Sequence, residues 1–286
     1  PSAFTGNGHY GGRFRKLRIA ALQADTQQAI VQRYCAAFSH SGAYQDQLLA
    51  AIAEVRDRHG AANLAENPLM LTITMLVYEA QRRLPDSTAE LYRRIVEILC
   101  QTRRRPAFPL EIRRQALELI SEGAQQAGTV TWPVSEAIAV LQQKMPYQFT
   151  TIAETQEKID WLGRETGLLR FEKSEEGVML RTWHRSFQEY LAACRIAGGK
   201  DAVDAVTDRL FAPRGERPPI VEDPNWQGVL RFLVGVYGGQ QAERAQAYVE
   251  RLHDYATGKQ ALPVQVGAAR VLALVATGLA EYKEHF

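Results

Sequence analysis

Two short apolar segments lie close together in the second half of the chain, Leu168-Leu169-Arg170-Phe171-Glu172 and Val178-Met179-Leu180-Arg181-Thr182. Between them, residues 173–177 form a charged stretch that ends in glycine. Short β-prone runs on both sides of a charged, glycine-containing turn are typical of a β-hairpin. The sequence therefore predicts two antiparallel strands here, and the elements around this hairpin set the fold class.

Three helical patterns precede the predicted hairpin, at residues 109–125, 134–144 and 152–165, and Gly167 ends the last one. Glycine commonly follows the end of a helix because it adopts the left-handed conformation without strain. Three helices followed by a hairpin is the element order of a winged-helix domain. We therefore predict a winged-helix domain over residues 105–197.

The segment that follows the hairpin is Trp183-His184-Arg185-Ser186-Phe187-Gln188-Glu189-Tyr190-Leu191-Ala192-Ala193. Its apolar side chains recur at helical spacing and share one face of a helix: Phe187, Tyr190, Leu191 and Cys194. His184 lies just before that face. A helix start has unpaired N–H groups and a partial positive charge, so it favours anions. His184 is therefore a candidate contact for a phosphate.

Helical patterns also dominate the first third of the chain, at residues 26–38, 44–58, 61–66, 68–82 and 88–103. We expect Asp25 to cap the first of these helices and Asn67 to cap the fourth, which begins with Pro68. Ser87 and Glu90 have the spacing of a capping box for the fifth. The helix at 68–82 is apolar on most sides, so we expect it to be buried.

The remaining segments complete the predicted order of elements. Residues 16–22 form a short apolar run consistent with a strand, and Arg103-Arg104-Arg105-Pro106 interrupts the helical pattern like a domain boundary. Helical patterns resume after Gly198-Gly199 and extend through residues 262–279. The sequence thus predicts a mainly α chain, with a short N-terminal strand, a helical domain, a winged-helix domain with its small β-hairpin, and a C-terminal helical region.

Composition and charge exclude several classes of protein. The chain has 286 residues, of which 46% are hydrophobic and 23% charged, a balance typical of a globular protein of two or three domains. A formal net charge of +2 gives no electrostatic reason to expect nucleic acid or an anionic membrane as the main partner. Cys35, Cys100 and Cys194 each lie in an apolar helical pattern, which predicts buried free thiols in a reducing, cytoplasmic compartment.

The sequence contains no motif of a complete active site. It lacks the P-loop pattern, a nucleophile elbow, a zinc-protease motif and a Cys/His metal cluster, so we expect neither catalytic residues nor a bound metal in this chain. It has no apolar run long enough to cross a membrane, no signal peptide and no initiator methionine. We expect it to be part of a longer protein.

The candidate binding residues each have a purely structural explanation. From residue chemistry alone, a histidine that caps its own helix is the commoner explanation for His184, and a helix-starting proline is the commoner explanation for Pro68. A solvated basic run at a helix end explains Arg103 to Arg105 as well as phosphate contacts do. Both explanations stay open at this level.

A winged helix also raises the possibility of DNA binding, in which case its third helix enters the major groove and should be basic. Residues 152–165 instead carry four carboxylates against Lys158 and Arg164. Phosphates repel such a surface, so we expect this domain to pack against protein rather than nucleic acid.

Three sequence blocks resemble the NACHT family of STAND nucleotide-switch ATPases in both order and spacing. They are Asn67-Pro68-Leu69-Met70-Leu71, then Arg83-Leu84-Pro85-Asp86-Ser87-Thr88-Ala89-Glu90-Leu91-Tyr92, then the Trp183 to Ala193 segment. The resemblance implies that residues 1–22 are the tail of a nucleotide-binding domain, that 23–104 are a first helical domain, and that 198–286 are a second one after the winged helix.

The resemblance also implies roles for two residues. In the closed, ADP-bound state of this family a winged-helix histidine contacts the β-phosphate and a proline of the first helical domain packs on the adenine; by motif these match His184 and Pro68. The nucleotide, ADP or ATP with Mg²⁺, is bound mainly by a P-loop domain that this chain lacks. On this analogy the full-length protein is an ATPase, although this chain by itself is not.

We therefore expect the chain to be the regulatory arm of a bacterial NACHT signalling ATPase in antiviral defence or stress signalling. Its partners are then its own P-loop domain and, on activation, further copies of itself. Two alternatives remain: a winged-helix transcription regulator that binds DNA, and a helical scaffold that binds only protein.

Overall fold

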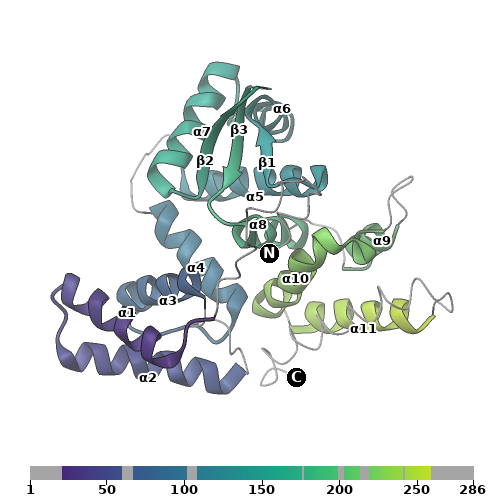
Figure 1. The fold of residues 1–286 in the computed structure, drawn as a ribbon. Coiled ribbons are helices and arrows are strands. Elements are labelled where there is room, and N and C mark those ends of the chain that lie inside the picture. The colour runs from purple at the N-terminus through teal and green to yellow at the C-terminus, as the bar shows by residue number, and fades with distance from the viewer. Residues whose placement is uncertain are drawn as a thin grey trace, which may run out of the picture.

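The computed structural model describes residues 21–59, 67–101, 108–175, 177–198, 203–212, 219–240 and 242–258. These residues are mainly helical and include one three-stranded antiparallel sheet. In Figure 1 the helices α1 to α3 lie at one end of the molecule, the sheet with α6 and α7 lies at the other, and α8 lies between them. None of the described helices is long and apolar enough to cross a membrane.

The first group of helices comprises α1 (Ala24–Ala37), α2 (Gly42–His59), α3 (Pro68–Gln81) and α4 (Thr88–Gln101). The prediction that Asp25 caps α1 was wrong. The helix begins earlier because the N–H of Gln27 bonds to the carbonyl of Gln23 at 2.9 Å, which leaves Asp25 inside the first turn. The predicted caps of α3 and α4 are confirmed: Asn67 Oδ1 accepts from the N–H of Leu69 at 2.8 Å, and Ser87 Oγ accepts from the N–H of Glu90 at 3.2 Å.

Helix α3 is buried on two sides, which explains why its sequence is apolar nearly all round. One side contributes Leu71, Met75 and Tyr78 to a small core shared with α1 and α2. The other side contributes Met70, Ile73 and Val77 to the main core. A helix that joins two cores has no face left for a polar stripe, so the prediction that it is buried is confirmed.

The sheet and its helices follow in the order α5 (Leu110–Ala127), β1 (Thr131–Pro133), α6 (Val134–Lys144), α7 (Ile152–Thr166), β2 (Leu169–Ser174) and β3 (Gly177–Thr182). The predicted hairpin is confirmed: β2 pairs with β3, with Leu169 opposite Thr182. Gly167 ends α7 with φ of 67°, a left-handed conformation that favours glycine. Strand β1 pairs with the free edge of β3, so the sheet order is β1-β3-β2.

Helix α8 (Arg185–Ala197) occupies the centre of the molecule, packed between α5 and α10 (Gln227–Gln240). Its apolar face is buried as predicted at Phe187, Tyr190 and Leu191, whereas Cys194 is only half-buried. Ala192 and Ala193 are also fully buried, which lets neighbouring helices approach closely. The approach is closest at Gly228 of α10, where a Cβ atom would lie 2.2 Å from the carboxylate of Glu189.

The C-terminal part contains α9 (Val203–Phe211), two short 3₁₀ turns at Ile220–Glu222 and Pro224–Trp226, α10, and α11 (Ala242–Gly258). Trp226, which is 2% exposed, anchors the 3₁₀ turns in the main core. Four predictions fall wholly or mainly outside the described residues: the strand at 16–22, the helix at 61–66, the Arg103 to Arg105 run, and the helix at 262–279.

Candidate functional site

His184 is the N-cap residue of α8. Its backbone is extended, with φ of −144° and ψ of 146°, and its ring Nδ1 accepts a hydrogen bond from the N–H of Ser186 at 3.2 Å. The carbonyl of His184 accepts from the N–H of Phe187 at 3.0 Å. Two N–H groups of the first turn are therefore already bonded to His184 and are not available to a ligand. At this helix start the imidazole ring is the group that a ligand would contact first.

The cap fixes the tautomer of the ring. Because a backbone N–H donates to Nδ1, the neutral imidazole carries its proton on Nε2. Nε2 makes no hydrogen bond with any of the described residues, and the side chain is exposed. Partial desolvation lowers the pKa of His184 below its ordinary value, which favours the neutral form. The exposed ring thus carries one N–H donor, on Nε2, without a partner among the described residues.

The hydroxyl groups of Ser186 and Tyr92 form a chain that restrains the imidazole ring of His184. Ser186 Oγ lies 2.7 Å from His184 Nδ1, and the hydroxyl of Tyr92 donates to Ser186 Oγ at 2.7 Å. The N–H and the hydroxyl of Ser186 both face Nδ1, so they share its single lone pair as donors. Burial raises the pKa of Tyr92 to about 12, which keeps its hydroxyl protonated as a donor.

Tyr92 joins the start of α8 to the start of α3. It lies on α4, is 3% exposed, and its hydroxyl also lies 3.1 Å from Met70 Sδ in the first turn of α3. Pro68 begins that turn and is itself exposed. The two predicted site residues therefore flank one buried tyrosine, with His184 joined to it through Ser186 and Pro68 two residues before Met70. The structure shows no direct contact between His184 and Pro68.

A buried amide network fixes the position of α8. Gln188 Nε2 donates to Gln125 Oε1 at 3.0 Å and to the carbonyl of Thr129 at 3.1 Å, and Gln125 Nε2 donates to the carbonyl of Asn225 at 2.6 Å. Arg185 reaches the same carbonyl of Asn225 at 3.2 Å. Gln188 Oε1 is buried without a partner among the described residues, but the donations by the two amides and by Arg185 join the His184 end of α8 to α5 and to the start of α10.

Sequence reasoning missed Tyr92, Ser186 and the two glutamines. Tyr92 and Ser186 are separated by 94 residues, and Gln188 and Gln125 by 63, so no local pattern reports these contacts. The one available signal was the position of Ser186 two residues after a helix cap, where a hydroxyl reaches the cap side chain.

Comparisons with known proteins do not assign the chain to a family. No protein-family model matches the chain, and no sequence among the curated proteins matches it. Within the part of the chain that the structure describes, no three His, Cys, Asp or Glu side chains gather in a way that could hold a metal ion.

Proposed function

We propose that this chain is the regulatory arm of a NACHT-type signalling ATPase. In the resting state it holds ADP on a P-loop domain of the same protein, and nucleotide exchange releases the arm so that the protein opens and oligomerises. In this proposal His184 donates from Nε2 to the β-phosphate and Pro68 packs on the adenine. Mg²⁺ and the remaining nucleotide contacts belong to the P-loop domain, and the setting is bacterial defence or stress signalling.

One observation carries the proposal: the ring of His184 is exposed at the start of α8, and its Nε2 N–H has no hydrogen-bond partner among the described residues. A ring that merely capped its helix needs only Nδ1. The additional chain through Ser186 and Tyr92 restrains the ring rotation that the cap alone allows, which is what a fixed phosphate contact requires.

The chain of hydroxyls also suggests how opening is coupled to the nucleotide. Tyr92 belongs to the proposed first helical domain and Ser186 to the proposed winged helix. If these units separate, Ser186 loses its donor from Tyr92 and His184 loses part of its support. Loss of the phosphate contact and separation of the units therefore favour each other, as a two-state switch requires.

The arrangement of residues 105–197 supports a winged helix within this arm. Helices α5, α6 and α7 precede the β2–β3 hairpin, and β1, which lies between α5 and α6, pairs with β3. We propose the domain limits 1–22, 23–104, 105–197 and 198–286 on the same basis.

The DNA-binding alternative is disfavoured by the side chains of α7. Lys158 is 8% exposed and is bonded to Glu154 and to the carbonyl of Gln148, so it faces inward. Of the two basic residues on this helix only Arg164 is exposed, and the surface is therefore more acidic than the sequence alone implies.

The test is His184→Ala in the longer protein that the proposal requires. We expect weaker retention of ADP and higher basal activity, because the substitution removes the donor to the β-phosphate. Unchanged ADP occupancy and unchanged basal activity contradict the proposal. A nucleotide response that survives substitution of both His184 and Pro68 supports the protein-binding scaffold instead.

A further inference from the structure

A cleft separate from the His184 site lies between α4, α5, α8 and α10, with a volume of about 280 Å³. Its α10 wall is formed by Gly235, Val236 and Gly239, so it presents little more than backbone and one apolar side chain. A smaller cavity of about 130 Å³ adjoins it, and Glu118, Tyr190 and Cys194 line both spaces. The two spaces together are large enough for a small organic molecule.

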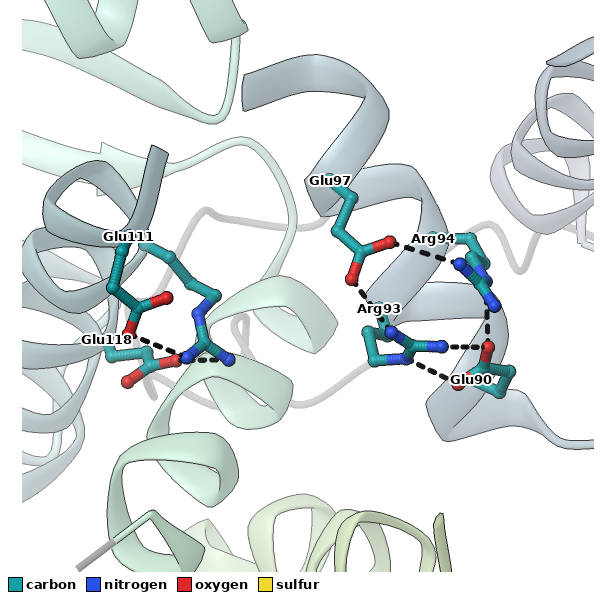
Figure 2. A network of polar contacts seen from close by, with 7 residues as sticks. Glu90, Arg93, Arg94, Glu97, Glu111 and Glu118 are labelled. Atoms are coloured by element: carbon teal, nitrogen blue, oxygen red, sulfur yellow. Dashed lines mark hydrogen bonds and ion pairs between the residues drawn. The ribbon is translucent and has the colours of Figure 1, made fainter. Parts of the chain in front are cut away.

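The arginines around this cleft are already neutralised by carboxylates. Arg93 bonds to Glu97 at 2.9 Å and to Glu90, and Arg114 bonds to Glu111 at 2.9 Å. Figure 2 shows these pairs as two groups, one on α4 and the other around Glu111 and Glu118 of α5. Because each guanidinium is satisfied, the cleft does not offer a strong site for an anion.

Glu118 is paired more loosely than these carboxylates, through an ion pair with Arg114 that is too long for a hydrogen bond. It is 6% exposed, its nearest cation is Arg114 Nη1 at 3.7 Å, and its carboxyl accepts no hydrogen bond from any of the described residues. A buried carboxylate without donors is costly, and burial accordingly raises the pKa of Glu118 to about 7. Arg114 and Arg195 lie near enough to act on its charge, but the carboxyl of Glu118 still lacks a donor at hydrogen-bond distance among the described residues.

We propose that the cleft binds a small organic amine whose ammonium group pairs with the carboxylate of Glu118. Ala89, Tyr190, Cys194 and Val236 line the space and supply contacts for its carbon chain. A divalent metal ion fits less well, because it prefers several oxygen ligands, whereas Glu90 and Glu111 bond to arginines at hydrogen-bond distance and only Glu118 is paired more loosely.

The position of the cleft gives the amine a structural consequence. Its walls come from α4, from α5 and α8, and from α10, which belong to the three helical units proposed above. A ligand that contacts all of these walls stabilises their closed arrangement. Binding of the amine does not require the nucleotide switch, so either proposal can be wrong while the other holds.

Ionisation of Glu118 makes binding depend on pH. The α10 wall contributes no titratable group among its described lining residues, and the other walls contribute these: Glu111, Arg114, Glu122, Tyr190, Cys194 and Arg195 from α5 and α8, and Glu90, Arg93 and Glu97 from α4. The arginines stay charged over the relevant range, so the carboxyl of Glu118 controls the charge of the site. Amine binding should strengthen as pH rises through about 7.

The experiment uses the 286-residue chain and putrescine as the probe, with binding measured by calorimetry near pH 6 and pH 8. We expect putrescine to bind about tenfold more tightly at the higher pH, since only ionised Glu118 attracts it. Butane-1,4-diol, which has the same length without the charge, and succinate, which carries the opposite charge, should not bind. Equal binding of the diol, preference for succinate, or no detectable binding of putrescine overturns the proposal.

Two variants locate the site. Glu118→Gln should weaken putrescine binding at least about tenfold and remove its pH dependence, whereas Asp46→Asn, an exposed carboxylate on α2, should leave both unchanged. Undiminished binding in folded Glu118→Gln overturns the assignment. If that variant does not fold, the pH dependence of putrescine binding and the comparison with the diol, both measured on the unmodified chain, decide whether the assignment to Glu118 stands.

Discussion

At the scale of single residues, His184 combines two tasks that the sequence alone presented as alternatives. Its Nδ1 caps α8 and its Nε2 has no partner among the described residues, so a helix cap and a phosphate contact are compatible in one ring. The position of His184 at a helix start was predictable because helix starts follow local patterns. Its support by Ser186 and Tyr92 was not, because that contact joins residues far apart in sequence.

The lowered pKa of His184 predicts a pH dependence of stability with a definite sign. The unfolded chain takes up a proton at the ordinary histidine pKa, whereas the folded chain does so at lower pH. The stabilising contribution is therefore complete above about pH 6.5 and declines as pH falls below it. Titration of the imidazole by nitrogen NMR should show neutral His184 protonated on Nε2. A ring protonated on Nδ1 at neutral pH contradicts the structure.

The raised pKa of Glu118 predicts the opposite pH dependence. The unfolded carboxyl ionises near pH 4.5 and the folded one near 7, so the folded state loses stability as pH rises between these values. A shift of this size corresponds to roughly 3 kcal/mol. Glu118→Gln should therefore raise the free energy of unfolding above about pH 7 and flatten its pH dependence, measured by urea denaturation. A variant that is less stable than the parent at about pH 8 argues for a bound cation or a structural role instead.

At the scale of elements, the helices and the hairpin were predictable and strand β1 was not. Its three residues, Thr131–Pro133, are too short for an alternating pattern and end in proline, which gives no strand signal. The strand exists because tertiary contacts hold it: Trp132 is 4% exposed, lies against Gly123 of α5, and its Nε1 donates to Glu136 at 2.7 Å.

This packing predicts different effects for two glycine substitutions. In Gly123→Ala the new Cβ would lie 2.3 Å from the rigid indole of Trp132, so β1 must move. We expect a loss of about 1–3 kcal/mol in the free energy of unfolding. Gly42→Ala is the matched control because nothing lies within 4 Å of its Cβ position, and it should change stability by no more than about 0.5 kcal/mol. Equal effects of the two substitutions contradict the packing of Trp132 on α5.

At the scale of the whole molecule, the contacts between the helical units could not be predicted from the sequence. The buried Gln188–Gln125 pair and the close approach of Glu189 to Gly228 depend on how α8 lies between α5 and α10. Hydrophobic periodicity gives the buried face of each helix, but it does not say which helix covers that face. The cleft at Glu118 arises from the same arrangement of helices, and no pattern in the sequence predicts it.

The charge of the molecule predicts that it does not bind duplex DNA. The net charge is +2, and Lys158 of α7 is turned inward. In fluorescence anisotropy at about 0.15 M salt, we expect no saturable binding of a labelled duplex, because carboxylates balance most of the cations and α7 exposes only Arg164 to displace counterions. Micromolar binding that weakens steeply with added salt favours the transcription-regulator alternative.

The most direct test of the account is ADP retention by His184→Asn in the longer protein. Asparagine is a good N-cap residue, so this variant keeps the cap of α8, while its shorter amide places no donor at the position of the imidazole Nε2. A hydrogen bond to a charged phosphate contributes about 1.5–3 kcal/mol, so ADP should dissociate roughly ten- to a hundredfold faster while thermal stability stays unchanged. Unaltered ADP dissociation in this folded variant contradicts the proposed role of His184.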